Sequence, residues 1–212
     1  MTQLPLKLRA AAVCLACMAG FVDALGFMHL GGFFTSFMTG NSTRMAVGLA
    51  ESSAVLMPAG LISLFVVGVF IGTLASNPPF SLSPRRLLVG IAALLAFAAL
   101  LALAGLATVA VFLTPVAMGA MNTAFQRNGE VAFGVTYMTG ALVKLGQRLA
   151  IAVSGGAPWG WLPYLLLWFG LLLGAVCGAL AYPLLGVSGL LVPAAVLALV
   201  GVFGFEDARP AL

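Results

Sequence analysis

Long segments with almost no charged side chain dominate this chain and decide its fold class. Segments 55–76 and 87–106 contain no Asp, Glu, Lys or Arg at all. Charged residues make up 7% of the chain and hydrophobic residues 63%, whereas an ordinary globular domain carries about 25% charged residues. An apolar helix of about 20 residues crosses the hydrocarbon core of a bilayer. The sequence therefore predicts an integral membrane protein and excludes a soluble fold.

The apolar segments are expected to be helices. Backbone polar groups must bond one another inside lipid, so only helix bundles and closed barrels span a membrane. Barrel strands alternate polar and apolar residues, and the segments here do not alternate. The predicted fold is an all-α transmembrane bundle. Its six predicted spans are 8–30, 55–76, 87–106, 107–126, 161–182 and 190–205.

Two further segments, 37–50 and 137–150, are predicted to be re-entrant half-helices. The first is too short to cross a bilayer alone, and each carries a cation near its middle, Arg44 and Lys144. If both crossed, Arg85, Arg86 and Arg127 would lie outside, against the positive-inside rule. A seven-span alternative stays open, because residues 135–154 are long enough to cross.

The charges also predict how the chain is oriented. With six spans and the N-terminus inside, most of the cations fall on the cytoplasmic side and Glu51 falls outside. Both termini are therefore expected on the cytoplasmic side of the membrane, with the chain crossing it several times. The cations assigned to the cytoplasmic side are Lys7, Arg9, Arg85, Arg86, Arg127, Arg148 and Arg209.

The half-helices begin alike, which indicates an internal repeat. Phe-Met-Thr-Gly at 37–40 matches Tyr-Met-Thr-Gly at 137–140, one hundred positions later. The predicted repeats are 1–106 and 107–212, together forming one membrane domain. Each contains three spans and one half-helix, and an odd number of crossings inverts the second repeat, as in many transporters. In this alignment Asp23 lies opposite Asn122, and the pair Gly68 and Gly72 opposite Gly170 and Gly174.

The repeated turns are the predicted binding site. Inverted half-helices would bring their N-termini together near the membrane midplane, where Thr39 and Thr139 offer hydroxyl groups and Gly40 and Gly140 allow close approach. Helix N-termini carry partial positive charge and favour anions. We therefore expect a small, anionic solute. The remaining predicted contacts are polar or charged side chains at membrane depth, and they are Asp23, Asn41, Arg44, Asn122 and Lys144.

Other functions are less well supported by the residues. No hydrolase, metalloprotease or phosphate-loop motif occurs, so no enzyme, cofactor or metal site is expected, and the scattered cations form no nucleic-acid-binding stripe. The favoured prediction is a small transporter or channel. The alternatives are a non-transporting component that assembles with partner proteins, which predicts no cavity at the turns, and an intramembrane enzyme. Size alone makes a homodimer plausible.

Several of these motifs occur together in a known family. Gly20-Phe21-Val22-Asp23, the run Met38-Thr39-Gly40-Asn41 and the second Met-Thr-Gly at 138–140 resemble the YoaK family of bacterial inner-membrane proteins. The resemblance extends over nearly the whole chain. It implies a multi-pass membrane protein and supplies no substrate.

Overall fold

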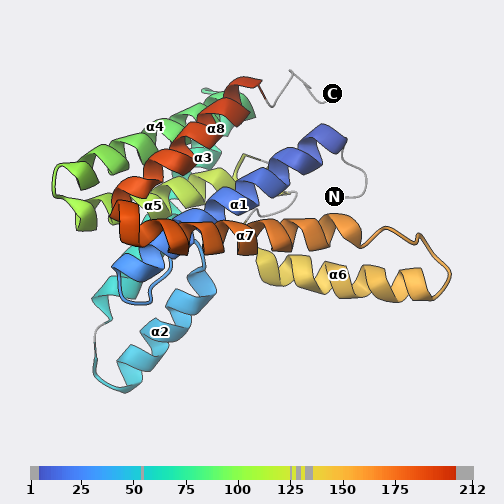
Figure 1. The fold of residues 1–212 in the computed structure, drawn as a ribbon, viewed down its shortest axis with the longest axis horizontal. Coiled ribbons are helices and arrows are strands. Elements are labelled where there is room, and N and C mark those ends of the chain that lie inside the picture. Colours follow the sequence, from blue (N-terminus) through green and yellow to red (C-terminus); the bar gives the residue numbers. More distant parts are fainter. Residues whose placement is uncertain (1–4, 54, 125, 128–129, 132–135, 204–212) are drawn as a thin grey trace.

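The structure, a computed structural model, describes residues 5–53, 55–124, 126–127, 130–131 and 136–203. Apart from the antiparallel two-residue strands β1 (Gln126–Arg127) and β2 (Glu130–Val131), these residues are helical or in loops. The prediction of an all-helical fold is confirmed to that extent (Figure 1). The helices are α1 (Leu6–His29), α2 (Met38–Ala50), α3 (Leu56–Ser76), α4 (Pro84–Leu103), α5 (Ala107–Asn122), α6 (Met138–Val153), α7 (Leu162–Leu185), the 3₁₀ helix η1 (Gly186–Leu190) and α8 (Leu191–Phe203).

Four helical segments are long and apolar enough to cross a membrane. They are Leu6–His29, Leu56–Ser76, Pro84–Leu103 and Leu162–Phe203, the last of which contains α7, η1 and α8. Within it the chain reverses at Gly186, whose φ of 55° lies in the left-handed region that favours glycine. The remaining predicted span, α5, is a 16-residue apolar helix, shorter than the other four segments. The chain is thus a multi-pass membrane protein.

Two long helix pairs form the body of the molecule, α1 with α7 and α3 with α5. In the first pair, Gly170, Gly174 and Gly178 face the backbone oxygens of Val13, Cys17 and Phe21 in the same order along both chains, so α1 and α7 run parallel. In the second pair α3 and α5 also run parallel, since Gly68 meets Val116 and Gly72 meets Ala120. Small residues without Cβ atoms allow the helix backbones to approach this closely.

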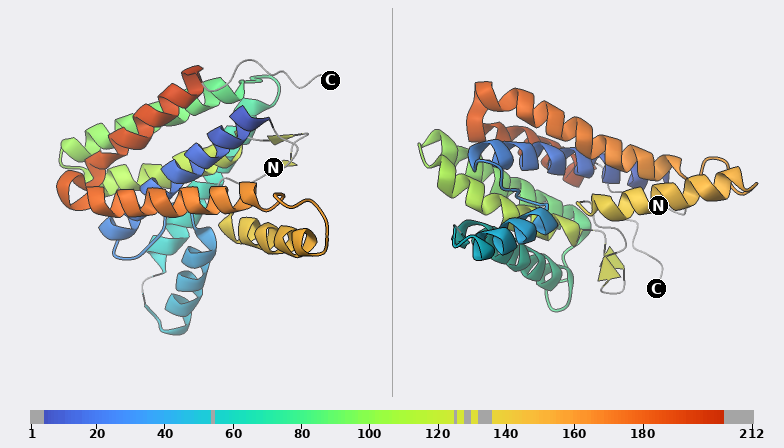
Figure 2. Two further views of the ribbon diagram at one scale, coloured as in Figure 1. Left: turned by 45° about the vertical axis from the view of Figure 1, so that its right-hand side comes forward. Right: turned by 90° about the horizontal axis from the view of Figure 1, so that it is seen from below.

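Helices α2 and α6 are the least enclosed parts of the fold. Both start beside the bundle and then project away from it in different directions, as Figures 1 and 2 show. Only Asn41 and Gly48 of α2, and only Ala141 of α6, are buried. Helix α2 packs mainly on α3, and α6 on α7. Their N-terminal ends are therefore anchored, while most of their residues stay exposed or only partly buried.

The apolar core lies between α1, α4, α5 and the turn formed by η1. Its largest fully buried side chains include Leu15, Leu25, Leu95, Met118 and Leu190. Polar side chains are also buried, and Thr35, Ser36, Asn41 and Asn122 lie together near the starts of α2 and α6. Because a buried polar group without a partner is costly, these four side chains need hydrogen-bond partners within the fold.

Candidate functional site

The carboxylate of Asp23, on α1, organises the loop that leads into α2. Its Oδ1 accepts hydrogen bonds from the backbone N–H of Thr35 at 2.7 Å and of Ser36 at 2.8 Å, and from the Thr35 hydroxyl at 3.0 Å. Its Oδ2 accepts one from the Ser36 hydroxyl at 2.9 Å. The loop can reach back to α1 because Gly31 and Gly32 adopt φ values of 67° and 102°. Asp23 thus fixes the last residues before the α2 start.

A second side chain holds the same loop from the other side. Asn41, one turn into α2 and fully buried, accepts a hydrogen bond from the Phe34 N–H at 3.0 Å and donates one to the Phe34 carbonyl at 2.7 Å. An amide that bonds both groups of one residue acts like a neighbouring strand. The predicted polar role of Asn41 is therefore a structural one in this conformation.

The start of α6 is held in a related way by Asn122, at the end of α5. The Thr136 N–H and hydroxyl lie 3.3 and 3.1 Å from Asn122 Oδ1, and the Asn122 amide donates to Thr136 Oγ1 at 2.9 Å and to the Met118 carbonyl at 2.9 Å. Thr136 and Ser36 each stand two residues before the Met-Thr-Gly sequence. Asp23 and Asn122 therefore bind corresponding hydroxyl residues.

Helices α2 and α6 begin with the same backbone geometry. The residues at their N-caps, Phe37 and Tyr137, have φ of −86° in both cases and ψ of 75° and 69°. Neither side chain caps the helix that follows. At each helix start the first N–H already donates to a loop carbonyl, Met38 to Ser36 and Met138 to Thr136, and the N–H groups of the next two residues have no acceptor within the helix. Both helices thus present a partly positive end to the space before them.

That space is a cavity of about 410 Å³, which we call the polar cavity. Residues from both helix starts line it, with the hydroxyls of Thr39 and Thr139, the Asn122 amide and the ring of Phe65 on α3. Its complete lining is Ser36, Phe37, Met38, Thr39, Phe65, Asn122, Thr136, Tyr137, Met138 and Thr139. The two Met-Thr turns therefore meet at one cavity.

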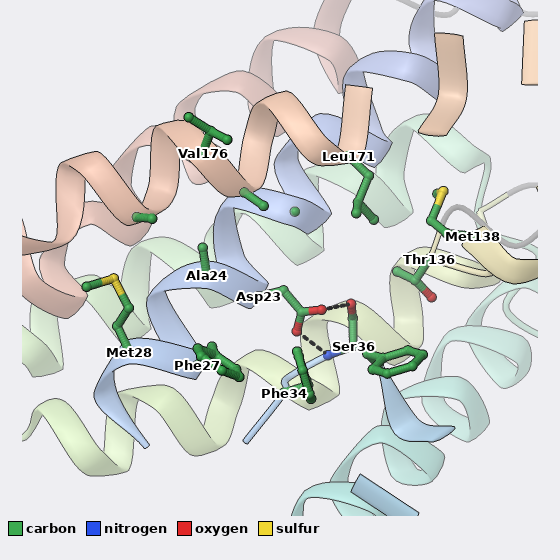
Figure 3. A pocket seen from close by; sticks show the side chains of 14 residues that line it. Asp23, Ala24, Phe27, Met28, Phe34, Ser36, Thr136, Met138, Leu171 and Val176 are labelled. Carbon is green, nitrogen blue, oxygen red and sulfur yellow. Dashed lines mark hydrogen bonds between the residues drawn. The ribbon is translucent and has the colours of Figure 1, made fainter. Parts of the chain in front are cut away.

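Figure 3 shows a second cavity of about 520 Å³, the apolar cavity. Helix α1 contributes Asp23 and apolar neighbours, and α7 contributes its Leu171 to Ala179 face. Ser36, Phe37, Thr136 and Met138 line both cavities. In Figure 3 the Asp23 carboxylate points at Ser36, at the boundary between the two. Asp23 is the only acidic residue among the described residues that line either cavity.

The structure brings part of the predicted site together. Asp23, Thr39, Asn122 and Thr139 all line one of the two cavities. Gly40 and Gly140 lie just behind, and a Cβ on either would overlap the ring of the aromatic residue at the helix start. These glycines therefore leave room for the rings of Phe37 and Tyr137, and they are not among the residues that line the two cavities.

The two predicted cations lie elsewhere. Arg44 and Lys144 are exposed on α2 and α6, and neither lines a cavity. The Arg44 guanidinium stacks over the Phe33 ring, 5.0 Å from its centroid, beside Gly32. The rise along each helix predicted that both cations lie near the turns, but neither is among the residues that line the two cavities.

Sequence reasoning missed two hydroxyl residues of the site, Ser36 and Thr136, which line both cavities. Ser36 and Thr136 were not predicted as site residues, although both bind the intramembrane polar side chain of their own half. The signal was present, because a hydroxyl residue precedes each Phe/Tyr-Met-Thr-Gly sequence at the same spacing. A Ser or Thr residue just before a helix start without a side-chain cap indicates that hydrogen bonds hold the preceding loop.

Comparison with known proteins agrees with the architecture. A family model described as "Protein of unknown function (DUF1275)" matches residues 11–203. The UPF0700 transmembrane protein RA0705 of Rhizobium meliloti strain 1021 is 33% identical over 206 residues, which cover 94% of this chain and 87% of that protein. The UPF0700 transmembrane protein YoaK of Bacillus subtilis strain 168 is 31% identical over 147 residues, 65% of each chain. No solved structure matches the chain. The chain belongs to the DUF1275 family of bacterial transmembrane proteins, which includes YoaK.

Proposed function

We propose that this protein is a small transporter or channel of the bacterial inner membrane, which binds a small anionic solute in the polar cavity. The observation that carries the proposal is the cavity of about 410 Å³ into which the first turns of both α2 and α6 open. Two uncapped helix N-termini and the hydroxyls of Thr39 and Thr139 supply hydrogen-bond donors and partial positive charge without a bound cation.

The nearby carboxylate of Asp23 is occupied by the loop before α2. It accepts four hydrogen bonds from Thr35 and Ser36, and these donors stabilise its charged form. It lines the apolar cavity and not the polar one. The donors of the two helix starts therefore remain the groups closest to a solute between them.

Helix packing supports an inverted repeat. The α1–α7 and α5–α3 pairs exchange partners between the two predicted halves, and both are parallel. In the first, Gly20 meets Leu171 and Gly174 meets Cys17, and in the second, Gly119 meets Phe65 and Gly68 meets Val116. These contacts make Gly68 the counterpart of Gly174. The sequence comparison had paired Gly68 with Gly170, one helical turn earlier.

Parallel packing also supports six spans over seven. If α6 crossed the membrane while α2 did not, the direction of α7 would reverse and α1 and α7 would be antiparallel. Their contacts run in parallel order. With six spans, α1 and α7 cross in the same direction, and the positive-inside rule then places both termini in the cytoplasm.

The cavity favours transport over the two alternatives. A component that only assembles with partners would have a packed centre at the turns. An intramembrane hydrolase would need an oxyanion site beside a nucleophile and base. Ser36 lies 2.9 Å from Asp23, but the adjacent N–H groups of Thr35 and Ser36 donate to the carboxylate and so are not free to form such a site.

The proposal is tested by anion binding and flux. Purified protein is screened by thermal shift against formate, acetate, bicarbonate, nitrate and phosphate, because a ligand of the folded state raises its melting temperature. Any anion that binds is then tested as a labelled solute in proteoliposomes. We expect the double variant Thr39→Val, Thr139→Val to lose binding by at least about tenfold.

The matched control is Thr43→Val, since Thr43 is exposed on α2 and its hydroxyl bonds only the Thr39 carbonyl. This variant should bind and transport as the parent does. Unchanged binding in the double variant, or no response to any anion by a folded protein, would reject an anion site between the helix starts.

A further inference from the structure

The two oxygens of Asp23 are used unequally. Oδ1 accepts three hydrogen bonds, two from backbone N–H groups and one from the Thr35 hydroxyl, whereas Oδ2 accepts only that of the Ser36 hydroxyl. A carboxylate oxygen offers about two lone pairs. Oδ1 is therefore fully occupied in holding the loop, and Oδ2 has acceptor capacity left.

The surroundings of Oδ2 favour a change in the charge of the Asp23 carboxylate. Asp23 lines the apolar cavity, whose described lining contains no other ionisable side chain from α1, α6, α7 or the loop. Tyr137 lines only the polar cavity, Arg44 stacks on Phe33, and His29 bonds Tyr182 and Thr108 at the far end of α1. An ionisable group at membrane depth without an ion pair is a common proton carrier in transport proteins.

The same geometry disfavours a metal ion. Three hydrogen atoms point at Oδ1 and would repel a cation, so Oδ2 alone could act as a ligand. Among the described residues no group of three or more His, Cys, Asp or Glu side chains could hold a metal. A proton needs only one lone pair and is the cation that fits.

We propose that Asp23 binds a proton at Oδ2 and that Ser36 couples this proton to the solute. The inference rests on the proposed function. With Asp23 ionised, the Ser36 hydroxyl donates to Oδ2. When a proton enters from the cavity and binds Oδ2, the new O–H donates to Ser36 Oγ, and the Ser36 hydroxyl hydrogen turns away. Ser36 lines both cavities, so it then donates to an anion in the polar cavity.

Proton and anion consequently favour each other's binding, because linkage between two sites is reciprocal. The loop stays in place throughout, since Oδ1 remains an acceptor in a protonated carboxyl group. The second half has no equivalent: Asn122 is an amide that cannot take up a proton at neutral pH. The transport cycle then carries one proton at Asp23 for each anion.

The proton site is tested by infrared difference spectroscopy of the full chain in lipid nanodiscs, recorded between neutral and acidic buffer. We expect a protonated carboxyl band from an apolar site that is present in the parent, absent in Asp23→Asn and retained in Glu51→Gln. Glu51 ends α2 and is exposed, so its carboxyl serves as the control. A band that persists in Asp23→Asn, or no such band in the parent, overturns the inference.

Coupling is tested with Ser36→Ala and with nitrate, whose charge does not change with pH. Removing one hydrogen bond to the charged form should increase the proton affinity of Asp23 by about threefold to tenfold. Nitrate should increase the proton affinity in the parent and have no effect in Ser36→Ala. A band insensitive to Ser36→Ala overturns the coupling. If the band behaves as expected while nitrate and the other four anions fail to bind, the proton site stands and the proposed anion site fails.

Discussion

The two helix starts differ in one residue that matters. At α2 the carboxylate of Asp23 accepts bonds from two backbone N–H groups and two hydroxyls, whereas at α6 the amide of Asn122 bonds one loop residue, Thr136, and the Met118 carbonyl of its own helix. The backbone at the two N-caps nevertheless agrees within 6° in ψ, 75° against 69°. A neutral amide therefore suffices to build this helix start. The carboxylate adds further hydrogen bonds to the loop before α2, and its charge is the main difference between the two helix starts.

The largest effect is expected at the two helix crossings, where α1 packs on α7 and α3 packs on α5. Gly174 faces the Cys17 carbonyl in the α1–α7 pair, and Gly68 faces the Val116 carbonyl in the α3–α5 pair. We expect Gly174→Leu and Gly68→Leu each to destabilise the protein by at least about 3 kcal/mol, because the new side chain meets backbone that cannot move aside. The measurement is the fraction of monodisperse protein by size-exclusion chromatography in detergent.

Gly90→Ala is the control for both crossings, since a Cβ at Gly90 on α4 meets no atom within 4 Å. It should fold normally and gain about 0.5–1 kcal/mol from helix propensity. A folded Gly68→Leu beside an unfolded Gly174→Leu would show that the two crossings are not equivalent.

The next largest effect should be a difference in stability loss between variants of Asp23 and Asn122, the two side chains that hold the loops. Asp23→Ala leaves the N–H groups of Thr35 and Ser36 without their acceptor, whereas Asn122→Ala removes the acceptor of one N–H group. At about 1–3 kcal/mol for each unsatisfied buried donor, we expect a loss of about 3 kcal/mol for Asp23→Ala and about half of that for Asn122→Ala. Unfolding by SDS in mixed micelles measures both. Equal losses would contradict the unequal anchoring described above.

A smaller effect on anion affinity should be equal for the two threonines of the polar cavity. Thr39→Val and Thr139→Val each remove one hydroxyl from the polar cavity, so each single variant should weaken anion binding by about threefold to tenfold. Affinities from isothermal titration in nanodiscs provide the comparison. A loss confined to one variant would place the solute beside a single helix and would remove the symmetry from the site.

The smallest effect concerns the two cations. Arg44→Ala should cost about 0.5–1 kcal/mol of stability, because the guanidinium stacks on Phe33, and Lys144→Ala should cost less. Neither change should alter anion affinity by more than about twofold, since both side chains are exposed away from the cavities and distant exposed charges are screened. A large loss of affinity in either variant would bring that cation back into the binding site.

Much of the fold could be predicted because it depends on local pattern. The half-helix predicted to begin at Phe37 begins at Met38, and the first span predicted over 8–30 occupies Leu6–His29. Apolar length and the punctuating glycines determine such boundaries. The parallel pairing of α1 with α7 could not be predicted, because nothing in either segment specifies its partner.

The site was predicted in part for the same reason. The duplicated Met-Thr-Gly turns predicted Thr39 and Thr139 as site residues, and both line the polar cavity. Arg44 was placed there by its distance along the helix alone, and the direction of its side chain depends on the rings of the preceding loop. The bonds of Ser36 and Thr136 arise only when α1 and α5 bring their polar residues to those loops.

The exchange of partners between the halves has a consequence for how the protein is made. Helix α1 packs on α7, which begins more than 130 residues after α1 ends at His29, with Leu162 as its first residue. During synthesis, which proceeds from the N-terminus, the first half leaves the ribosome with α1 lacking its main contact, and the Gly20 face stays uncovered until the last quarter of the chain arrives. Helix α1 therefore cannot reach its final packing before α7 is made, and a chain that ends before α7 would leave this face of α1 uncovered.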